Sequence, residues 1–185
     1  MAMVYIFLAD GFEEIEGLTV VDLLRRAKID IRMVSITGNK LVTGSHQITV
    51  LADDLFENMD FSDAEMLVLP GGMPGTTNLS MHEGLDGLLR EFHSKGKALA
   101  AICAAPSILG TKGLLTGKHA VCYPGYEEKL LGATIYNTSV VVDGNVTTSK
   151  GMGTSIDFSL SIIQSIAGEA EAKKIAAAIQ YQYWL

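Results

Sequence analysis

The segment of this 185-residue chain that is best suited to catalysis is Ala100–Ser107. It contains Cys103, one of the two cysteines. Small apolar residues lead directly into Cys103, and Pro106 lies where the first turn of a helix would begin. This order predicts a nucleophile elbow with cysteine in place of serine. The helix N-terminus favours a thiolate, so we expect a lowered pKa for the thiol. The same composition also suits a small cysteine buried as a hydrophobe.

A second candidate is the glycine-rich segment Pro70–Gly75, which follows the apolar run Met66–Leu69. Glycines let the backbone approach a ligand closely and leave N–H groups available. The N–H groups of Gly72 and Ala104 could together form an oxyanion hole beside Cys103. The alternative is a tight loop at the end of a strand. No Gly-Lys-Ser/Thr sequence follows, so the segment is not a phosphate-binding P-loop.

Three carboxylates, Glu13, Glu14 and Glu16, lie at the start of an expected helix. The helix dipole favours acidic side chains there, which is sufficient to explain Glu13 and Glu14. Glu16 leans toward a different face from Glu14 and would lie at the edge of the sheet. A partly desolvated carboxyl beside a thiolate has a raised pKa, so a protonated Glu16 could donate to the sulfur of Cys103.

The segment Thr148–Ser155 contains two glycines, Gly151 and Gly153, before an expected helix. It could cradle an anion or close a pocket. The alternative, which we favour, is helix capping by Thr154 or Ser155. The four histidines show no metal-ligand spacing and the two cysteines form no CxxC pair, so we expect neither a metal nor another cofactor.

The elements that must position these residues follow from the apolar pattern, in which short buried runs alternate with longer amphipathic runs. The expected strands are Val4–Ala9, Ile31–Ile36, Met66–Leu69, Ala98–Ile102, Ala120–Cys122, Thr134–Tyr136, Val140–Val142 and Val146–Ser149. The expected helices are Glu13–Lys28, Glu83–Ser94, Ala104–Gly113, Thr154–Ile166 and Ala170–Ala178. Leu41–Val42 and Ile48–Leu51 are expected to pair as an inserted hairpin.

Strands that are apolar throughout and separated by helices indicate a mainly parallel sheet covered on both faces. We therefore predict one α/β domain over residues 1–185, a flavodoxin-like three-layer α/β/α sandwich with an inserted β-hairpin. In such sheets, ligands lie beyond the carboxyl ends of the strands. This rule selects four segments for a site: the loop after Ala9, Pro70–Gly75, Cys103 and Lys150–Gly153.

The composition restricts the location and the partners of the protein. A net charge of −7 disfavours nucleic acid as a partner. Two cysteines cannot form a disulfide framework, which favours a reducing, cytoplasmic location. No run reaches about 18 apolar residues, and no basic residues precede the apolar start, so we expect neither a membrane span nor a signal peptide.

Taken together, these segments resemble the ThiJ/PfpI family of the class I glutamine amidotransferase-like superfamily, and its deglycase-like branch more than its peptidase branch. The matching motifs are Ala9–Glu16, Val20–Arg26, Leu67–Gly72, Ala101–Pro106 and Thr148–Ser155. The resemblance implies a flavodoxin-like fold, with Cys103 as nucleophile, Glu16 as its protonated partner and Gly72 and Ala104 as oxyanion contacts.

The resemblance also implies a pocket, a homodimer and an easily oxidised cysteine. The pocket residues implied in this way are Gly71, Tyr123, Gly151 and Gly153. Arg26 and His46 fall where the deglycase-like branch places dimer contacts near the site. A sulfinate formed on Cys103 would be stabilised by a short hydrogen bond from protonated Glu16.

The sequence departs from the family pattern at two positions. The peptidase branch has a histidine directly after the nucleophile, where this chain has Ala104, so the imidazole base of a cysteine protease is missing. Many members place a histidine after the next strand, where this chain has Tyr123, a poor base near neutral pH. Neither position therefore supplies a histidine for proton transfer.

The function we expect is a cysteine-dependent glyoxalase or protein deglycase that acts on reactive dicarbonyls or early glycation adducts. Cys103 would add to the aldehyde as a hemithioacetal, Glu16 would shuttle a proton, and hydrolysis would release a hydroxy acid. A redox sensor or chaperone-like protein without turnover is the alternative, because a low thiol pKa suits oxidation equally. An intracellular cysteine peptidase is disfavoured by Ala104.

Overall fold

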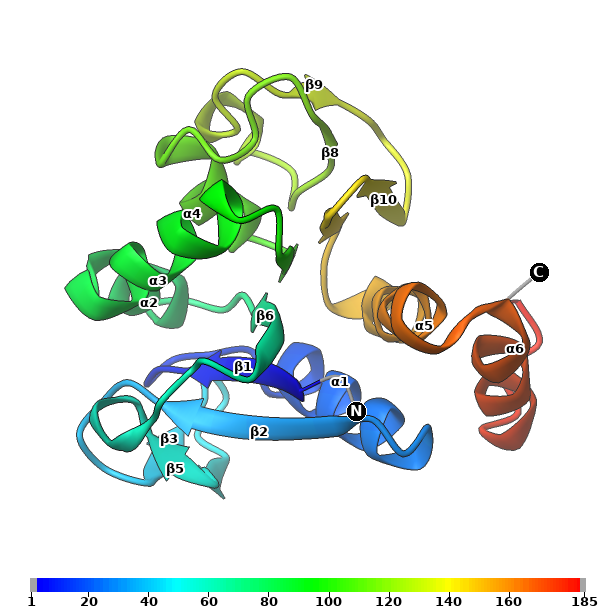
Figure 1. The fold of residues 1–185 in the computed structure, drawn as a ribbon, viewed down its shortest axis with the longest axis horizontal. Coiled ribbons are helices and arrows are strands. Elements are labelled where there is room, and N and C mark those ends of the chain that lie inside the picture. The colour runs from blue at the N-terminus through cyan, green and yellow to red at the C-terminus, as the bar shows by residue number, and fades with distance from the viewer. Residues whose placement is uncertain (1–2, 184–185) are drawn as a thin grey trace.

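The structure is a computed structural model that describes residues 3–183. A seven-stranded sheet has the order β10-β11-β7-β6-β1-β2-β5, and helices lie on both of its faces (Figure 1). Its parallel strands are β1 (Met3–Leu8), β2 (Asp30–Ser35), β5 (Asp54–Leu55), β6 (Ala64–Leu69), β7 (Ala98–Ile102) and β11 (Val146–Ser149). The edge strand β10 (Val140–Asp143) runs antiparallel to β11. This architecture confirms the predicted flavodoxin-like α/β sandwich.

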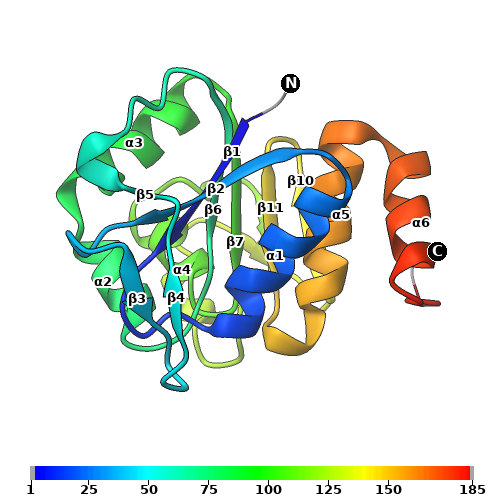
Figure 2. The ribbon, with the colours of Figure 1, turned by 90° about the horizontal axis from the view of Figure 1, so that it is seen from below.

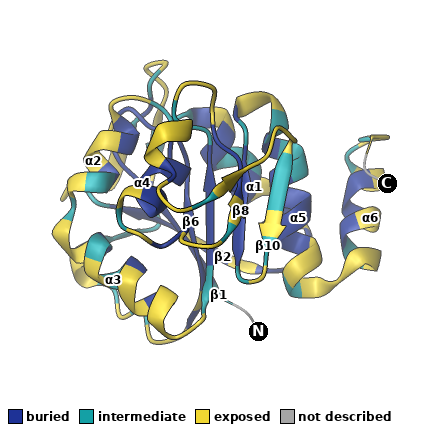
Figure 3. Ribbon diagram, turned by 90° about the horizontal axis from the view of Figure 1, so that it is seen from above, coloured by how far each residue is buried: buried dark blue, intermediate teal, exposed yellow. Residues whose placement is uncertain are grey.

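The core lies in two layers, because successive side chains of a strand point to opposite faces of the sheet. In β1, Ile6 and Leu8 pack in one buried cluster, whereas Tyr5 and Phe7 pack in the other. The first cluster is covered by α1 (Glu14–Arg26), α5 (Ser155–Ala167) and α6 (Glu169–Ala178). The second is covered by α2 (Gly75–Met81), α3 (Glu83–Ser94) and α4 (Pro106–Thr111). Figure 2 shows α1 beside α5 on one face, and Figure 3 shows the buried strands between helices with exposed outer sides.

The inserted hairpin is confirmed as the antiparallel pair β3 (Leu41–Thr43) and β4 (Thr49–Leu51). Two expected strands are shorter than predicted, at His119–Ala120 (β8) and Thr134–Ile135 (β9). They pair with each other in a separate small sheet and do not join the central one. The sequence did not predict α2, β5 or the short 3-10 turns at Phe56–Asn58, Glu127–Lys129 and Met152–Thr154.

The order of the strands places the candidate residues at one edge of the sheet. Strand β1 lies between β2 and β6, so the order in which the chain connects the strands reverses there, and ligands bind at such switch points.

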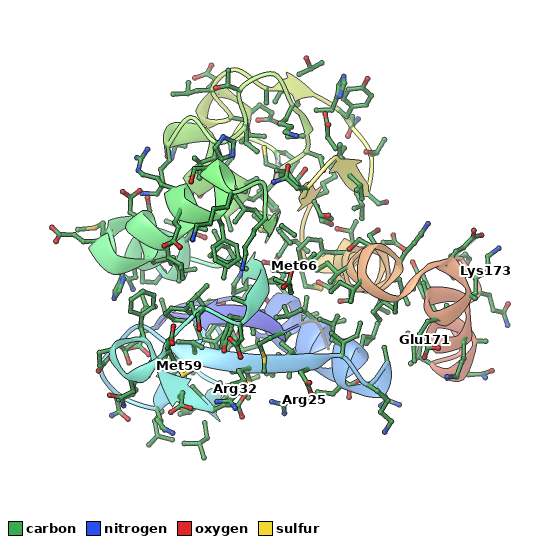
Figure 4. The ribbon with its side chains drawn as sticks, viewed as in Figure 1. Arg25, Arg32, Met59, Met66, Glu171 and Lys173 are labelled. Atoms are coloured by element: carbon green, nitrogen blue, oxygen red, sulfur yellow. The ribbon has the colours of Figure 1, made fainter. Side chains whose placement is uncertain are left out.

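The side of the sheet near β5 carries charged side chains. Arg25 and Arg32 extend outward there (Figure 4) and pair with Asp53 and Asp54 at 2.8 and 3.5 Å. Among residues 3–183, no helix has the length and apolar character needed to cross a membrane.

Candidate active site

Cys103 lies in a sharp turn between β7 and α4. Its φ is +65°, in the left-handed region that residues other than glycine rarely adopt. The backbone is held on both sides, because the N–H of Cys103 donates to the carbonyl of Ser149 at 2.9 Å and its carbonyl accepts from the N–H of Tyr123 at 2.8 Å. Such strain persists only where the surroundings impose it. The chain therefore has the strand–turn–helix geometry of a nucleophile elbow.

Glu16 is fully buried next to this turn. Its Oε2 accepts from the N–H of Gly71 at 2.8 Å, while Oε1 has no hydrogen-bond partner among the described residues. A Cβ on Gly71 would lie 2.6 Å from Glu16 Oε2 and 2.7 Å from the Cβ of Cys103. Glycine at this position therefore lets the carboxyl and the cysteine approach each other. The thiol interacts with the carboxyl without completing a well-aligned hydrogen bond to Oε1.

The pKa values of Glu16 and Cys103 are both raised. Burial raises the pKa of Glu16 to about 7, and the nearby thiol and the Gly71 N–H only partly oppose this. Burial raises the pKa of Cys103 to about 12, with the Glu16 carboxylate adding to the increase and the N–H groups of Ala104 and Gly72 opposing it. The expectation of an acidic thiol is therefore wrong for a cysteine beside an ionised Glu16, because lost hydration and a neighbouring negative charge outweigh the helix terminus.

The carboxyl and the thiol titrate as a coupled pair. Burial raises the pKa of both groups, and each group affects the pKa of the other. The N–H groups of Gly72 and Ala104 favour a negative charge on the sulfur, and the N–H of Gly71 favours one on the carboxyl. One proton shared by sulfur and oxygen suits a nucleophile with its own acid–base partner.

Cys103 lies in the wall of a cavity of about 690 Å³. The lining residues are Glu13, Glu16, His46, Gly72, Cys103, Tyr123, Pro124, Lys150, Gly151, Met152, Gly153 and Thr154. All four segments selected from the strand ends contribute to this wall. Of the residues proposed for the site from sequence, Gly71 and Ala104 are not part of the lining. Their backbone N–H groups instead interact with the two site residues, that of Gly71 with the Glu16 carboxyl and that of Ala104 with the Cys103 sulfur.

The loop after β11 closes one side of the cavity. A Cβ on Gly151 would lie 3.2 Å from the ring of Tyr123, so the loop and the ring pack closely. Thr154 Oγ1 lies 2.8 Å from the carbonyl of Gly151 and 2.7 Å from Ser149 Oγ. Thr154 occupies the N-cap position of α5 without a side-chain capping bond to that helix, but its Oγ1 accepts from the N–H of Gly151 at 3.2 Å at the start of the preceding 3-10 turn. Ser155 donates back to Met152, so capping of α5 itself by these hydroxyls is wrong, and they fix the loop before it.

His46 lines the same cavity from the turn between β3 and β4. Glu14 holds this turn against α1. Its Oε1 accepts the backbone N–H groups of His46 and Ile48 at 2.8 and 3.4 Å, and its Oε2 lies 3.0 Å from His46 Nδ1. Burial opposes ionisation of Glu14, but these hydrogen bonds outweigh it and lower its pKa. Glu14 is thus a buried anchor for the turn, which the helix dipole alone did not predict.

Arg26 lies at the other end of α1 from Glu16. Ten residues of helix separate the two, which corresponds to about 15 Å. Its guanidinium pairs with Asp22 at 2.7 Å on an exposed surface. Within one chain Arg26 therefore does not lie near the site with His46, and its role as a dimer contact remains a prediction.

Glu13, Glu14 and His46 form a cluster that the sequence spacing did not show, because His46 follows Glu14 by 32 positions. One potential ligand atom from each lies within 4.8 Å of the others. The oxygens of Glu14 are already used by the N–H donors of His46 and Ile48 and by the imidazole. We therefore assign the cluster to positioning of His46 and not to a metal ion.

The fold and the site together define a class of α/β proteins in which a strained elbow cysteine lies against a buried glutamate at the carboxyl edge of a parallel sheet. Residues 2–165 match the model of the DJ-1/PfpI family. The chain therefore belongs to this family, as the resemblance of its motifs predicted.

Individual relatives agree with this assignment. Protein DJ-1 homolog A of Arabidopsis thaliana is 37% identical over 177 residues, which cover 94% of this chain but 45% of the relative, so the chain spans less than half of that protein. A deglycase of Pyrococcus abyssi is 32% identical over 152 residues, which cover 81% of this chain and 90% of the relative. The structure of oxidized Toxoplasma gondii DJ-1 superposes with a TM-score of 0.95 at 33% identity, covering 99% of this chain and 100% of the other.

Proposed function

We propose that this protein converts reactive dicarbonyl compounds, or the early adducts that they form on proteins, into hydroxy acids without a cofactor. The observation that carries this proposal is the close approach of the half-buried Cys103 to the fully buried carboxyl of Glu16 at the wall of a cavity. The N–H groups of Gly72 and Ala104 lie beside the sulfur, where an oxyanion would form. The similarity to an archaeal protein named a deglycase supports the same reaction class.

The chemistry starts with a proton transfer within this pair. The Glu16 carboxylate takes the proton of the Cys103 thiol, and the sulfur adds to the aldehyde carbon of methylglyoxal while Glu16 holds the proton. A C–S bond forms, the aldehyde oxygen takes the negative charge beside the N–H groups of Gly72 and Ala104, and Glu16 then protonates it. The product of this step is a hemithioacetal.

The remaining steps use the Glu16 carboxylate and one water. Glu16 takes the carbon-bound proton from the former aldehyde carbon and delivers it to the ketone carbon, while the hydroxyl proton of the hemithioacetal passes to the former ketone oxygen, which gives a thioester of lactate. Water then cleaves the C–S bond, which releases lactate and restores the thiol of Cys103. The overall reaction adds one water to methylglyoxal without net oxidation, so it needs no redox cofactor.

Lactate formation from methylglyoxal by the purified protein, in the absence of glutathione, tests this proposal. We expect activity in the wild type, its loss in Cys103→Ser and its retention in Cys122→Ser, because Cys122 is buried and does not line the cavity. Equal rates in the wild type and in Cys103→Ser would reject the assignment.

A redox-sensing role is the second candidate, and it rests on Oε1 of Glu16. This buried oxygen has no partner among the described residues, and a sulfinate on Cys103 would accept a short hydrogen bond from it once Glu16 is protonated. Intact-mass measurement after mild peroxide treatment separates the two functions. Stable addition of two oxygen atoms at Cys103, together with no dicarbonyl turnover, would favour sensing.

A further inference from the structure

Within residues 3–183, His46 is the only histidine that lines the cavity of Cys103. Its position is set by backbone bonds. The N–H of His46 donates to Glu14 Oε1 at 2.8 Å, and the N–H of the preceding Ser45 donates to the carbonyl of Phe12 at 2.8 Å. The turn that carries the imidazole is therefore fixed to the start of α1, the same helix that carries Glu16.

The side chain of Glu14 also determines which imidazole nitrogen carries hydrogen. Its Oε2 lies 3.0 Å from His46 Nδ1. An ionised carboxylate can only accept a hydrogen bond, so Nδ1 carries a hydrogen. Among the described residues Nε2 has no hydrogen-bond partner, and 67% of the His46 side chain is exposed. Nε2 therefore has no competing partner among these residues, on a side chain that belongs to the cavity lining.

The charges around the imidazole favour its protonated form. Nδ1 lies 3.0 Å from Glu14 Oε2 and 3.4 Å from Glu13 Oε2. The hydrogen bond to Glu14 and the charges of both carboxylates raise the pKa of His46. The other titratable groups that line the cavity are Glu16, Cys103, Tyr123 and Lys150. A protonated His46 carries an N–H at Nε2 as well as at Nδ1, and this residue lines the cavity.

We propose that His46 determines specificity for dicarbonyls by donating Nε2–H to the second carbonyl oxygen, the one next to the carbon attacked by Cys103. This inference rests on the proposed function. A dicarbonyl has two adjacent oxygens, and the site has two separate sets of donors: the N–H groups of Gly72 and Ala104 beside the sulfur, and the imidazole in the cavity wall. A simple aldehyde engages only the first set, so only a dicarbonyl gains from His46.

The test measures how well an aldehyde protects Cys103 from alkylation by iodoacetamide, in a Cys122→Ser background. Methylglyoxal and propanal both form a hemithioacetal, but only methylglyoxal has a second carbonyl. Because a hydrogen bond from a charged donor is stronger than one from a neutral donor, we expect His46→Gln to raise the half-protecting concentration of methylglyoxal at least about tenfold. The value for propanal should not change. His93→Gln, which replaces an exposed histidine outside the cavity, is the matched control.

The outcomes separate this inference from the proposed function. Unchanged protection by methylglyoxal in His46→Gln, or equal weakening for both aldehydes, would overturn the role of His46. A selective loss for methylglyoxal in Tyr123→Phe, with His46→Gln unaffected, would overturn it in favour of the phenol. If neither aldehyde protects Cys103 in the wild type, the proposed function itself fails.

Discussion

The carboxyl of Glu16 binds its proton more tightly in the folded chain than in the unfolded one. Burial raises its pKa from 4.5 to about 7. A raised pKa stabilises the folded state fully below pH 4.5, and this stabilisation is lost as the pH rises through about 7. The buried carboxyl therefore destabilises the protein at the pH where the site is charged, which is a cost of placing it beside Cys103.

The variant Glu16→Gln tests this cost, because glutamine cannot ionise and still offers an oxygen to the Gly71 N–H. The change in pKa corresponds to about 3 kcal/mol. We expect the unfolding free energy of the wild type to fall by about this amount, relative to the variant, between pH 4.5 and pH 8. Cys103 ionises near pH 12 and adds nothing over this range. Urea unfolding at both pH values measures the effect, and parallel pH dependences would contradict it.

Gly71 controls how closely the pair can approach. In Gly71→Ala the new Cβ would meet Glu16 Oε2 at 2.6 Å and the Cβ of Cys103 at 2.7 Å. We expect a loss of about 1–3 kcal/mol in stability and a fall of at least about tenfold in lactate formation, because the pair is forced apart. Gly87→Ala on α3, outside the cavity, is the matched control, since no atom beyond its own helix backbone lies within 4 Å of its added Cβ. Equal activity in the two variants would show that the spacing of the pair is unimportant.

At the scale of elements, α1, the helix that carries Glu14 and Glu16, ends in a Schellman motif. The N–H of Ile29 donates to the carbonyl of Leu24 at 3.0 Å, and the N–H of Lys28 donates to the carbonyl of Arg25 at 3.2 Å. Lys28 takes a φ of +59°, where glycine is normally found. A lysine at this position therefore carries backbone strain.

We expect Lys28→Gly to stabilise the protein by about 1 kcal/mol, because glycine adopts this conformation without steric cost. Thermal unfolding should show a rise in Tm of about 2–4 °C. The preceding residue provides the control. Ala27 has a φ of −75°, so Ala27→Gly should lower the Tm by increasing the entropy of the unfolded chain. A shift in the same direction for both variants would show that φ is not the cause.

The local sequence pattern was sufficient to predict the bounds of elements whose own residues determine where they begin and end. The bounds of α3 and β7 match the prediction because one has a clear apolar face and the other is apolar throughout. Helix α2 was missed because its residues Gly75–Met81 lack helical apolar spacing. Its start is held by the glycine loop, where the N–H of Thr76 donates to Gly72 at 2.8 Å. Such an element depends on tertiary contacts that a local pattern does not contain.

The same distinction applies to the site. The rule for parallel sheets found the segments that line the cavity, because strand ends can be located from apolar runs. The raised pKa of Cys103 was not predicted, and only the family resemblance placed His46 near the site, since both features depend on contacts between distant segments, with Glu16 and Glu14 respectively. The hairpin that follows β2 was predicted, but nothing in its sequence shows that its turn contacts the start of α1.

At the scale of the whole molecule, several large apolar side chains near the cavity are exposed. Ile15 at the start of α1 is 50% exposed, Ile48 and Leu51 in the hairpin are 54% and 64% exposed, and Met152 in the cavity wall is 54% exposed. Exposed apolar residues concentrated on neighbouring segments are typical of interaction surfaces. They are compatible with the homodimer that the family resemblance implies, which remains a prediction.

The variant Arg26→Ala tests that prediction. The only ion pair of Arg26 among the described residues is an exposed one with Asp22, and such exposed i,i+4 pairs contribute little to stability. The variant should therefore fold normally, and a change in its assembly would report on the surface between subunits. Arg90→Ala is the matched control, because Arg90 makes the equivalent pair with Asp86 at 3.0 Å on α3. In sedimentation equilibrium we expect Arg26→Ala to weaken the dimer about tenfold, as one lost contact of about 1.4 kcal/mol would do, while Arg90→Ala behaves as the wild type. Identical sedimentation of both variants would show that Arg26 lies outside the interface.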